Sequence, residues 1–218
     1  ALGLLFSLYP QGVGRLYTVN LAGSALGCVL ALLVPVWVRG EGIVWLSVIV
    51  GGGAALGFIW PGYRKARSSG APEHVVAVLA GMVAIGGITL LLASPAVLDL
   101  RLSPYKSLSY ALQFPSAQVT SQQWNGFSRV DVVESAGIRS LPGLSYRYMA
   151  APPPQRGLLV DGDDLNPILA LSPETASPAD LAFTDYLPTA IAYQLRPGAC
   201  ALVLEPRGGL ETWVALAQ

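Results

Sequence analysis

The sequence predicts a mixed fold, in which membrane-spanning α-helices precede a β-rich domain and the first strand and helix of an α/β domain. Composition carries the first part of this prediction. The chain is 53% hydrophobic and only 12% charged, whereas soluble domains carry about 25% charged residues. Charges are sparse up to residue 96 and ordinary beyond it. We therefore divide the chain into a membrane-helix region (1–97), a β-rich domain with a C-terminal helix (98–198) and the α/β segment (199–218).

Three apolar segments are long enough to span a lipid bilayer: residues 16–38, 43–60 and 74–97. Each approaches the roughly 20 residues that cross about 30 Å of hydrocarbon. None contains an internal acid, lysine or arginine. We predict one helix for each segment and no strand, because lipid cannot satisfy the open hydrogen bonds of a strand.

Small residues recur at four-residue spacing inside two of these segments. The pairs are Gly23 with Gly27, and Gly53 with Gly57. Such pairs let helix backbones approach closely, although small residues are also simply common in membrane helices. We favour close helix packing at these glycines.

Basic residues predict the orientation of the helices. Arg15 precedes the first segment, and Arg64, Lys65 and Arg67 separate the second from the third. Loops rich in Lys and Arg stay in the cytoplasm. If the third segment crosses fully, residues 98–218 lie outside the cytoplasm.

The β-rich domain is indicated by alternation and turn chemistry. Residues 117–124 and 127–134 partly alternate, and the Asn125-Gly126 pair between them is a hairpin signal, so we predict an antiparallel hairpin over 117–135. Residues 157–162 indicate a third strand that ends in an Asp-Gly turn. Residues 180–195 have helical spacing.

The last segment has the pattern of a βα unit. Residues 199–204 form a continuous apolar run, which predicts a buried strand, and Gly208-Gly209 separates this run from a helix-like end. Glycines let a backbone approach a ligand, and a helix N-terminus offers unpaired N–H groups. We therefore take Gly208, Gly209 and the following Glu211 as candidate cofactor-binding residues. A purely structural glycine turn is the alternative.

The sequence gives little support for nucleic-acid binding or for a metal site. No basic cluster with interleaved aromatic residues suggests nucleic-acid binding. His74 is the one histidine, and Cys28 and Cys200 have no metal-ligand spacing, so we expect no metal site and two buried thiols. The acids of residues 161–164 fit a hairpin turn better than a calcium loop, because the regular oxygen spacing is missing.

Several stretches resemble bacterial membrane-fused spermidine synthase-like proteins of the polyamine aminopropyltransferase family. They follow in the family's order and cover most of the chain: residues 13–27, 103–108, 127–135, 158–162, 185–188 and 202–211. The resemblance implies a multi-pass protein of the bacterial inner membrane, a small β-domain and a truncated Rossmann-like, methyltransferase-type domain. It also implies a possible homodimer.

The implied reaction moves an aminopropyl group from decarboxylated S-adenosylmethionine, a cosubstrate, to a polyamine such as putrescine. Acidic side chains suit the cationic acceptor and its proton. The resemblance makes Asp161, Asp185 and Tyr186 candidate substrate-binding residues. The chain departs from the family at Phe127-Ser128, where soluble members have Tyr-Gln, and at Glu205 and Arg207 in the glycine turn.

The family's catalytic acids are expected beyond Gln218, so the catalytic residues are unknown and the chain alone is expected to be inactive. The need for a cytoplasmic cosubstrate then favours a cytoplasmic location for the soluble part, against the count of crossings. A second function stays open: a transporter-like membrane module with a degenerate polyamine-binding or regulatory domain. A methyltransferase of another kind is a third, because a glycine turn does not distinguish donors.

Overall fold

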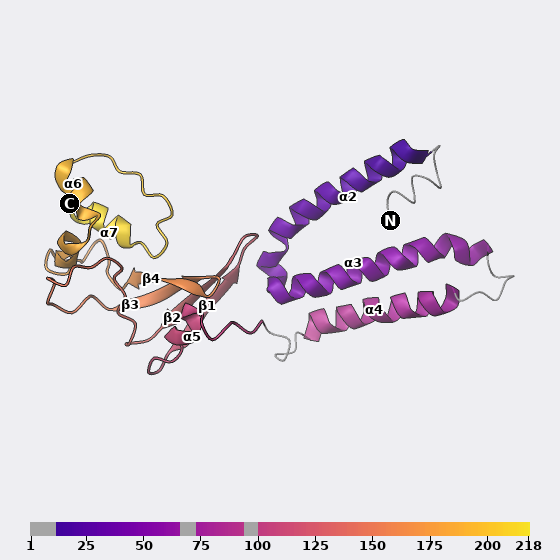
Figure 1. Ribbon diagram of the computed structural model, residues 1–218, viewed down its shortest axis with the longest axis horizontal. Coiled ribbons are helices and arrows are strands. Elements are labelled where there is room, and N and C mark those ends of the chain that lie inside the picture. The colour runs from indigo at the N-terminus through magenta and orange to yellow at the C-terminus, as the bar shows by residue number, and fades with distance from the viewer. Residues whose placement is uncertain (1–11, 66–72, 94–99) are drawn as a thin grey trace. The chain divides into compact units, whose positions relative to one another are not determined.

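The computed structural model describes residues 12–65, 73–93 and 100–218 (Figure 1). The chain forms two compact units. The first, the helical unit, comprises residues 1–100 with 124–127. The second, the sheet unit, comprises residues 101–123 and 128–218.

Three long helices build the helical unit: α2 (Val13–Leu33), α3 (Pro35–Lys65) and α4 (Glu73–Ala93). No strand occurs in the described parts of the three predicted spans. Two stretches, Val13–Leu33 and Pro35–Gly57, are long and apolar enough to cross a membrane, and Val78–Ala93 is a shorter apolar stretch. Residues 94–97 of the third predicted span lie outside the described residues. Membrane association therefore rests on two helices.

The first predicted span, 16–38, is wrong as a single helix, because α2 ends at Leu33. Pro35 has no N–H, so the hydrogen bond of this position to Ala31 is lost and the helix is interrupted. Helical contacts resume at once, since the Trp37 N–H donates to the Val34 carbonyl at 3.0 Å. The helical geometry then breaks at Arg39, whose φ is 61° and ψ 175°. The predicted boundary after residue 38 coincides with this break.

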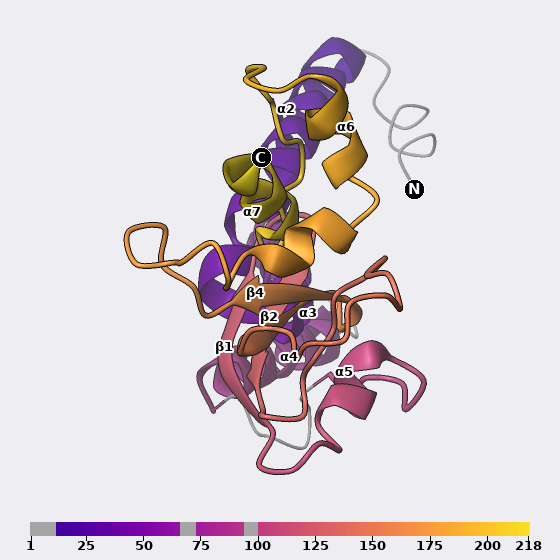
Figure 2. The ribbon, with the colours of Figure 1, turned by 90° about the vertical axis from the view of Figure 1, so that its left-hand side faces the viewer.

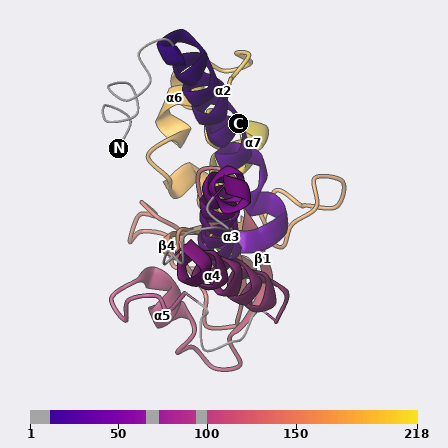
Figure 3. The same cartoon turned by 90° about the vertical axis from the view of Figure 1, so that its right-hand side faces the viewer.

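Helices α3 and α4 lie side by side (Figure 3). Glycine makes this approach possible at two positions. A Cβ on Gly52 would lie 3.0 Å from the Ala84 Cβ, and one on Gly87 would lie 3.0 Å from the Ile49 Cγ1. The glycines predicted to make such contacts have no described atom within 4 Å of an added Cβ: Gly23, Gly27, Gly53 and Gly57. These four glycines therefore make no close helix contact within the described chain, and close packing at them stays a prediction.

The sheet unit is built on a four-stranded antiparallel sheet in the order β1-β2-β3-β4. Figure 2 shows this unit facing the viewer. The strands are β1 (Gln118–Trp124), β2 (Arg129–Glu134), β3 (Gln155–Val160) and β4 (Asp163–Leu169). The predicted hairpin over 117–135 is confirmed by β1 and β2. Its turn is held by the Phe127 N–H, which donates to Asn125 Oδ1 at 2.8 Å.

The predicted Asp-Gly turn joins β3 to β4. Asp161 and Gly162 have φ values of 53° and 71°, and Val160 pairs with Asp163. Two consecutive positive φ values are the signature of a two-residue type I′ hairpin, for which Asp-Gly is a preferred sequence. Strand β4 itself was not predicted, because Asp, Asn and Pro are uncommon within strands.

Short helices cover the remaining parts of the sheet unit: α5 (Ser107–Ala111), the 3₁₀ helix η3 (Ala182–Tyr186), α6 (Ala190–Leu195) and α7 (Leu210–Ala217). The helix predicted over 180–195 is wrong as one element. It is divided into η3 and α6 around Pro188, because proline disfavours helical geometry in the residue before it.

Two hydrophobic cores hold these elements on the sheet. One joins β4 to η3, α6 and α7 and consists of Leu169, Phe183, Leu187, Ala190, Leu210 and Val214. The other lies under α5 and consists of Leu108, Ala111, Val133, Ile138 and Leu159. Since α7 contributes to the first core, residues 199–218 belong to the same compact unit as the sheet. The domain division at residue 198 stays a prediction.

The buried strand predicted over 199–204 is wrong. This segment forms no strand, and Leu202 and Leu204 are 85% and 78% exposed. A strand needs a neighbour for its backbone N–H and C=O groups, and the segment pairs with none of the four described strands. Cys200 is exposed rather than buried, and so is Cys28. A Rossmann-like fold is not shown by the described residues.

Candidate functional site

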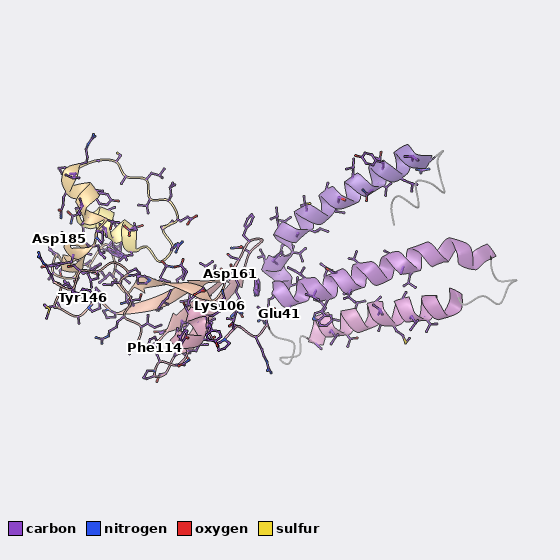
Figure 4. The ribbon with its side chains drawn as sticks, in the orientation of Figure 1. Glu41, Lys106, Phe114, Tyr146, Asp161 and Asp185 are labelled. Atoms are coloured by element: carbon purple, nitrogen blue, oxygen red, sulfur yellow. The ribbon has the colours of Figure 1, made fainter. Side chains whose placement is uncertain are left out.

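The predicted site residues are spread along strand β4. Asp161 precedes the strand, Gly208 lies against Pro167 in its middle, and Asp185 lies in η3, which packs on its far end. A strand rises about 3.3 Å per residue, so the two ends are separated by several side-chain lengths. Figure 4 places Asp161 and Asp185 in different parts of the sheet unit. The structure does not bring the predicted residues together in one site.

Asp161 ties two strands together. Its N–H donates to the Arg129 carbonyl at 2.7 Å, and its Oδ1 accepts a hydrogen bond from the Arg129 N–H at 2.8 Å. The short side chain of aspartate tolerates the left-handed backbone that this turn requires. The described role of this carboxylate is to fix the end of β2 on the β3–β4 hairpin, and substrate binding by Asp161 stays a prediction.

The other acids of the same turn also bond to protein groups. Asp163 Oδ1 accepts a hydrogen bond from the Ser107 hydroxyl at 2.6 Å, which lowers the pKa of Asp163, and Lys106 lies 3.4 Å away. Asp164 forms an ion pair with Arg207. These contacts favour the hairpin interpretation over the cation loop. Among the residues that the structure describes, no group of three or more His, Cys, Asp or Glu side chains is placed to hold a metal.

The glycine turn before α7 rests on the edge of the sheet. A Cβ on Gly208 would collide with the Pro167 carbonyl oxygen, so this glycine accommodates the backbone of β4. The Arg207–Asp164 ion pair holds the same turn. Gly209 caps α7 with a φ of 87° and has open space around it. Gly208 therefore faces protein, while Gly209 and the half-buried Glu211 in the first turn of α7 remain the accessible members of the predicted set.

Helix η3 presents a carboxylate next to an aromatic pair. Asp185 is exposed, and its Oδ1 accepts a hydrogen bond from the Gln218 side chain at 2.5 Å. The ring of the adjacent Tyr186 lies 5.3 Å from the ring of Tyr148 at an interplanar angle of 56°. The Ser145 N–H fixes this arrangement by donating to the Tyr186 carbonyl at 3.0 Å. We call Asp185, Tyr186 and Tyr148 the acid–aromatic site.

This combination suits a cationic ligand. An aromatic face attracts a cation through its quadrupole, and a carboxylate supplies the counter-charge. The sequence predicted Asp185 and Tyr186 but gave no indication of Tyr148, which lies in a loop far from them along the chain. The acid–aromatic site is therefore the best-formed part of the predicted substrate site.

A buried ion pair in β2 was not predicted. Arg129 Nε and an Nη of the same guanidinium donate to Asp131 Oδ1 at 3.0 and 2.8 Å. Asp131 is fully buried, and its Oδ2 has no hydrogen-bond partner among the described residues. The signal lay in the spacing of residues 129 and 131, which share one face of the strand with Val133. Because the Asp131 carboxylate is enclosed in the interior, we assign this pair to stability.

No protein-family model, curated protein or solved structure matches the chain. Fold and site define its class only broadly, as a chain with two membrane-capable helices and a mixed α/β unit on an antiparallel sheet. The function is therefore argued from the motifs and the geometry above.

Proposed function

We propose that the chain is part of a membrane-bound, spermidine synthase-like protein, whose sheet unit recognises a cationic amine such as putrescine. The observation that supports this proposal is the acid–aromatic site, in which exposed Asp185 lies in η3 beside Tyr186, whose ring contacts that of Tyr148. Decarboxylated S-adenosylmethionine is the proposed cosubstrate of the full-length protein. Its reaction needs an amine held in line with the carbon beside the sulfonium.

The membrane-capable helices support a location at the bilayer. Within the proposal this is the inner membrane of a bacterium, crossed several times. The sheet unit lies in the cytoplasm, where putrescine and the cosubstrate are made. The basic residues between the second and third apolar segments, Arg64, Lys65 and Arg67, argue for the opposite side if α4 crosses completely. The cosubstrate requirement outweighs them here.

Putrescine binding tests the acid–aromatic site. We expect Asp185→Asn to weaken putrescine binding about tenfold or more, because a charge-assisted contact is lost. Isothermal titration of the 218-residue chain in detergent micelles measures this. Asp180→Asn is the matched control, since Asp180 is also exposed, and its carboxylate bonds to Ser177 instead. Equal affinities for Asp185→Asn and the unmodified chain would contradict the proposal.

A second candidate function is favoured by the glycine turn. Because Gly208 packs on Pro167, this glycine offers no open backbone to a cosubstrate. That arrangement suits a degenerate domain that binds polyamines and regulates a transporter-like membrane module.

Product formation separates the two candidates. We expect the 218-residue chain to form no spermidine from putrescine and decarboxylated S-adenosylmethionine, because the catalytic acids expected from the resemblance are not among its residues. The full-length protein in nanodiscs is expected to form spermidine, measured by mass spectrometry. Binding of putrescine without product in the full-length protein would favour the regulatory function.

A further inference from the structure

A cavity lies where β2 ends and β3 begins. Its volume is about 370 Å³, within the range of small-molecule sites, about 300–1,000 Å³. It is lined by Glu134 at the end of β2, by Arg139 in the following loop and by the prolines before β3, Pro152–Pro154. Its floor includes Ser135 and Gln155. The cavity shares no residue with the acid–aromatic site, and no part of the proposed function uses it.

The floor of this cavity is fixed by internal hydrogen bonds. The Ser135 hydroxyl donates to the Pro115 carbonyl at 2.9 Å and accepts from the Gly137 N–H at 3.1 Å. With its amide oriented so that both atoms are satisfied, the Gln155 side chain donates to the Ser140 carbonyl at 2.8 Å and accepts from the Ser140 N–H at 3.2 Å. Both residues are buried. These bonds fix the positions of both side chains in the floor of the cavity.

The two charged side chains that line the cavity can still form ion pairs with a ligand. Arg139 is exposed and has no ion pair or side-chain hydrogen bond within the described part of the chain. Among the residues that the structure describes, Glu134 pairs with Arg156 alone, at 3.9 Å, and these side chains are 51% and 56% exposed. A pair so long and so exposed holds its partners weakly. The cavity therefore presents one available guanidinium and one available carboxylate.

We propose that this cavity binds a small zwitterion of the α-amino acid class. The ligand carboxylate pairs with Arg139, whose planar fork matches it, and the ligand ammonium pairs with Glu134. The apolar part of the ligand lies on Pro152–Pro154, a wall that loses little conformational freedom on binding. A simple anion would face the charge of Glu134 and a simple cation that of Arg139. Only a ligand that carries both charges pairs with both Arg139 and Glu134.

L-leucine is the probe for this proposal, because its side chain suits the proline wall. We expect the 218-residue chain in detergent micelles to bind L-leucine in isothermal titration. N-acetyl-L-leucine, which lacks the ammonium, and L-leucinamide, which lacks the carboxylate, are each expected to bind about tenfold more weakly or worse, as the loss of one charged contact implies.

Two variants assign the contacts to the cavity. Arg139→Gln is expected to weaken L-leucine binding about tenfold and to abolish the preference for L-leucine over L-leucinamide. Glu134→Gln is expected to weaken L-leucine binding about tenfold and to abolish the preference for L-leucine over N-acetyl-L-leucine. Both residues are exposed, so the fold is retained. Arg147→Gln, at an exposed arginine outside the cavity, is the control and should bind normally. No binding of L-leucine, equal binding of all three probes, or unchanged affinity in Arg139→Gln would each overturn the proposal.

Discussion

Asp131→Ala is expected to lower the free energy of unfolding of the sheet unit by about 3–5 kcal/mol, the usual cost of removing one partner of a buried ion pair. Asp131 is fully buried, and two nitrogens of Arg129 bond to its Oδ1. The variant leaves the guanidinium in the interior without this carboxylate. Hydrogen exchange of peptides from β2 and β3, followed by mass spectrometry in a urea series, measures the change locally.

Two controls show whether burial of the charge is the cause. The double variant Arg129→Met, Asp131→Leu is expected to recover most of the loss, because two apolar side chains of similar volume replace both charges. Arg156→Ala removes one partner of an exposed pair with Glu134 and is expected to cost less than about 1 kcal/mol. A loss below about 1 kcal/mol in Asp131→Ala would contradict the expected importance of the buried pair.

Gly208→Val is expected to release α7 from the sheet. A side chain at this position meets the Pro167 carbonyl oxygen, which belongs to the backbone of β4 and cannot rotate away. If the turn lifts, the buried side chains of Leu210 and Val214 leave the core, and each contributes about 1.5–3 kcal/mol by burial. We expect a loss of about 3 kcal/mol or more, read from hydrogen exchange in residues 210–217 and from Trp213 fluorescence.

Gly209→Ala separates this steric effect from backbone strain. Gly209 has a φ of 87°, but open space surrounds it. An alanine there is expected to lower the free energy of unfolding by about 1–2 kcal/mol, the cost of holding a residue with a Cβ in the left-handed conformation. If Gly208→Val and Gly209→Ala destabilise α7 equally, the steric explanation for the effect at Gly208 is wrong.

The features that the sequence predicted correctly depend on local chemistry. The hairpin loop at Asn125-Gly126 and the Asp161-Gly162 turn were predicted because both residue pairs are preferred in hairpin turns. Of the two pairs, Asp161-Gly162 has the two consecutive positive φ values of a type I′ turn. The helical character of the apolar spans was predicted because their length and lack of charge leave few alternatives. Pro35 also indicates an interruption, but this indication was missed because apolar residues continue on both sides of the proline.

The features that the sequence did not predict depend on partners far along the chain. Alternation in β2 suggests Val130 and Val132 as the inner face, yet Arg129, Asp131 and Val133 are the buried residues. The packing of Leu108 and Leu159 against Val133 decides the face, and the ion pair permits it. Likewise, an apolar run becomes a strand only beside another strand, and residues 199–204 have none in the described chain.

The candidate site was predicted in part for the same reason. Asp185 and Tyr186 are neighbours along the chain, so one motif pointed to both. Tyr148 completes the acid–aromatic site from a loop that no local pattern connects to η3. Gly208 was predicted as a ligand contact from its place in the glycine turn, and Asp161 from the family resemblance. The described structure gives each of them a protein partner, which no local pattern indicated.

The proline in the last strand limits how the sheet can grow. Strand β4 is an edge, and Pro167 within it has no N–H to offer an incoming strand. The glycine turn occupies the space beside the carbonyl of the same residue. Within the described chain, β1 is then the one edge left for pairing with another molecule. A sheet with a single open edge can join one copy of itself edge to edge, but it cannot propagate into a fibril by adding strands at both ends.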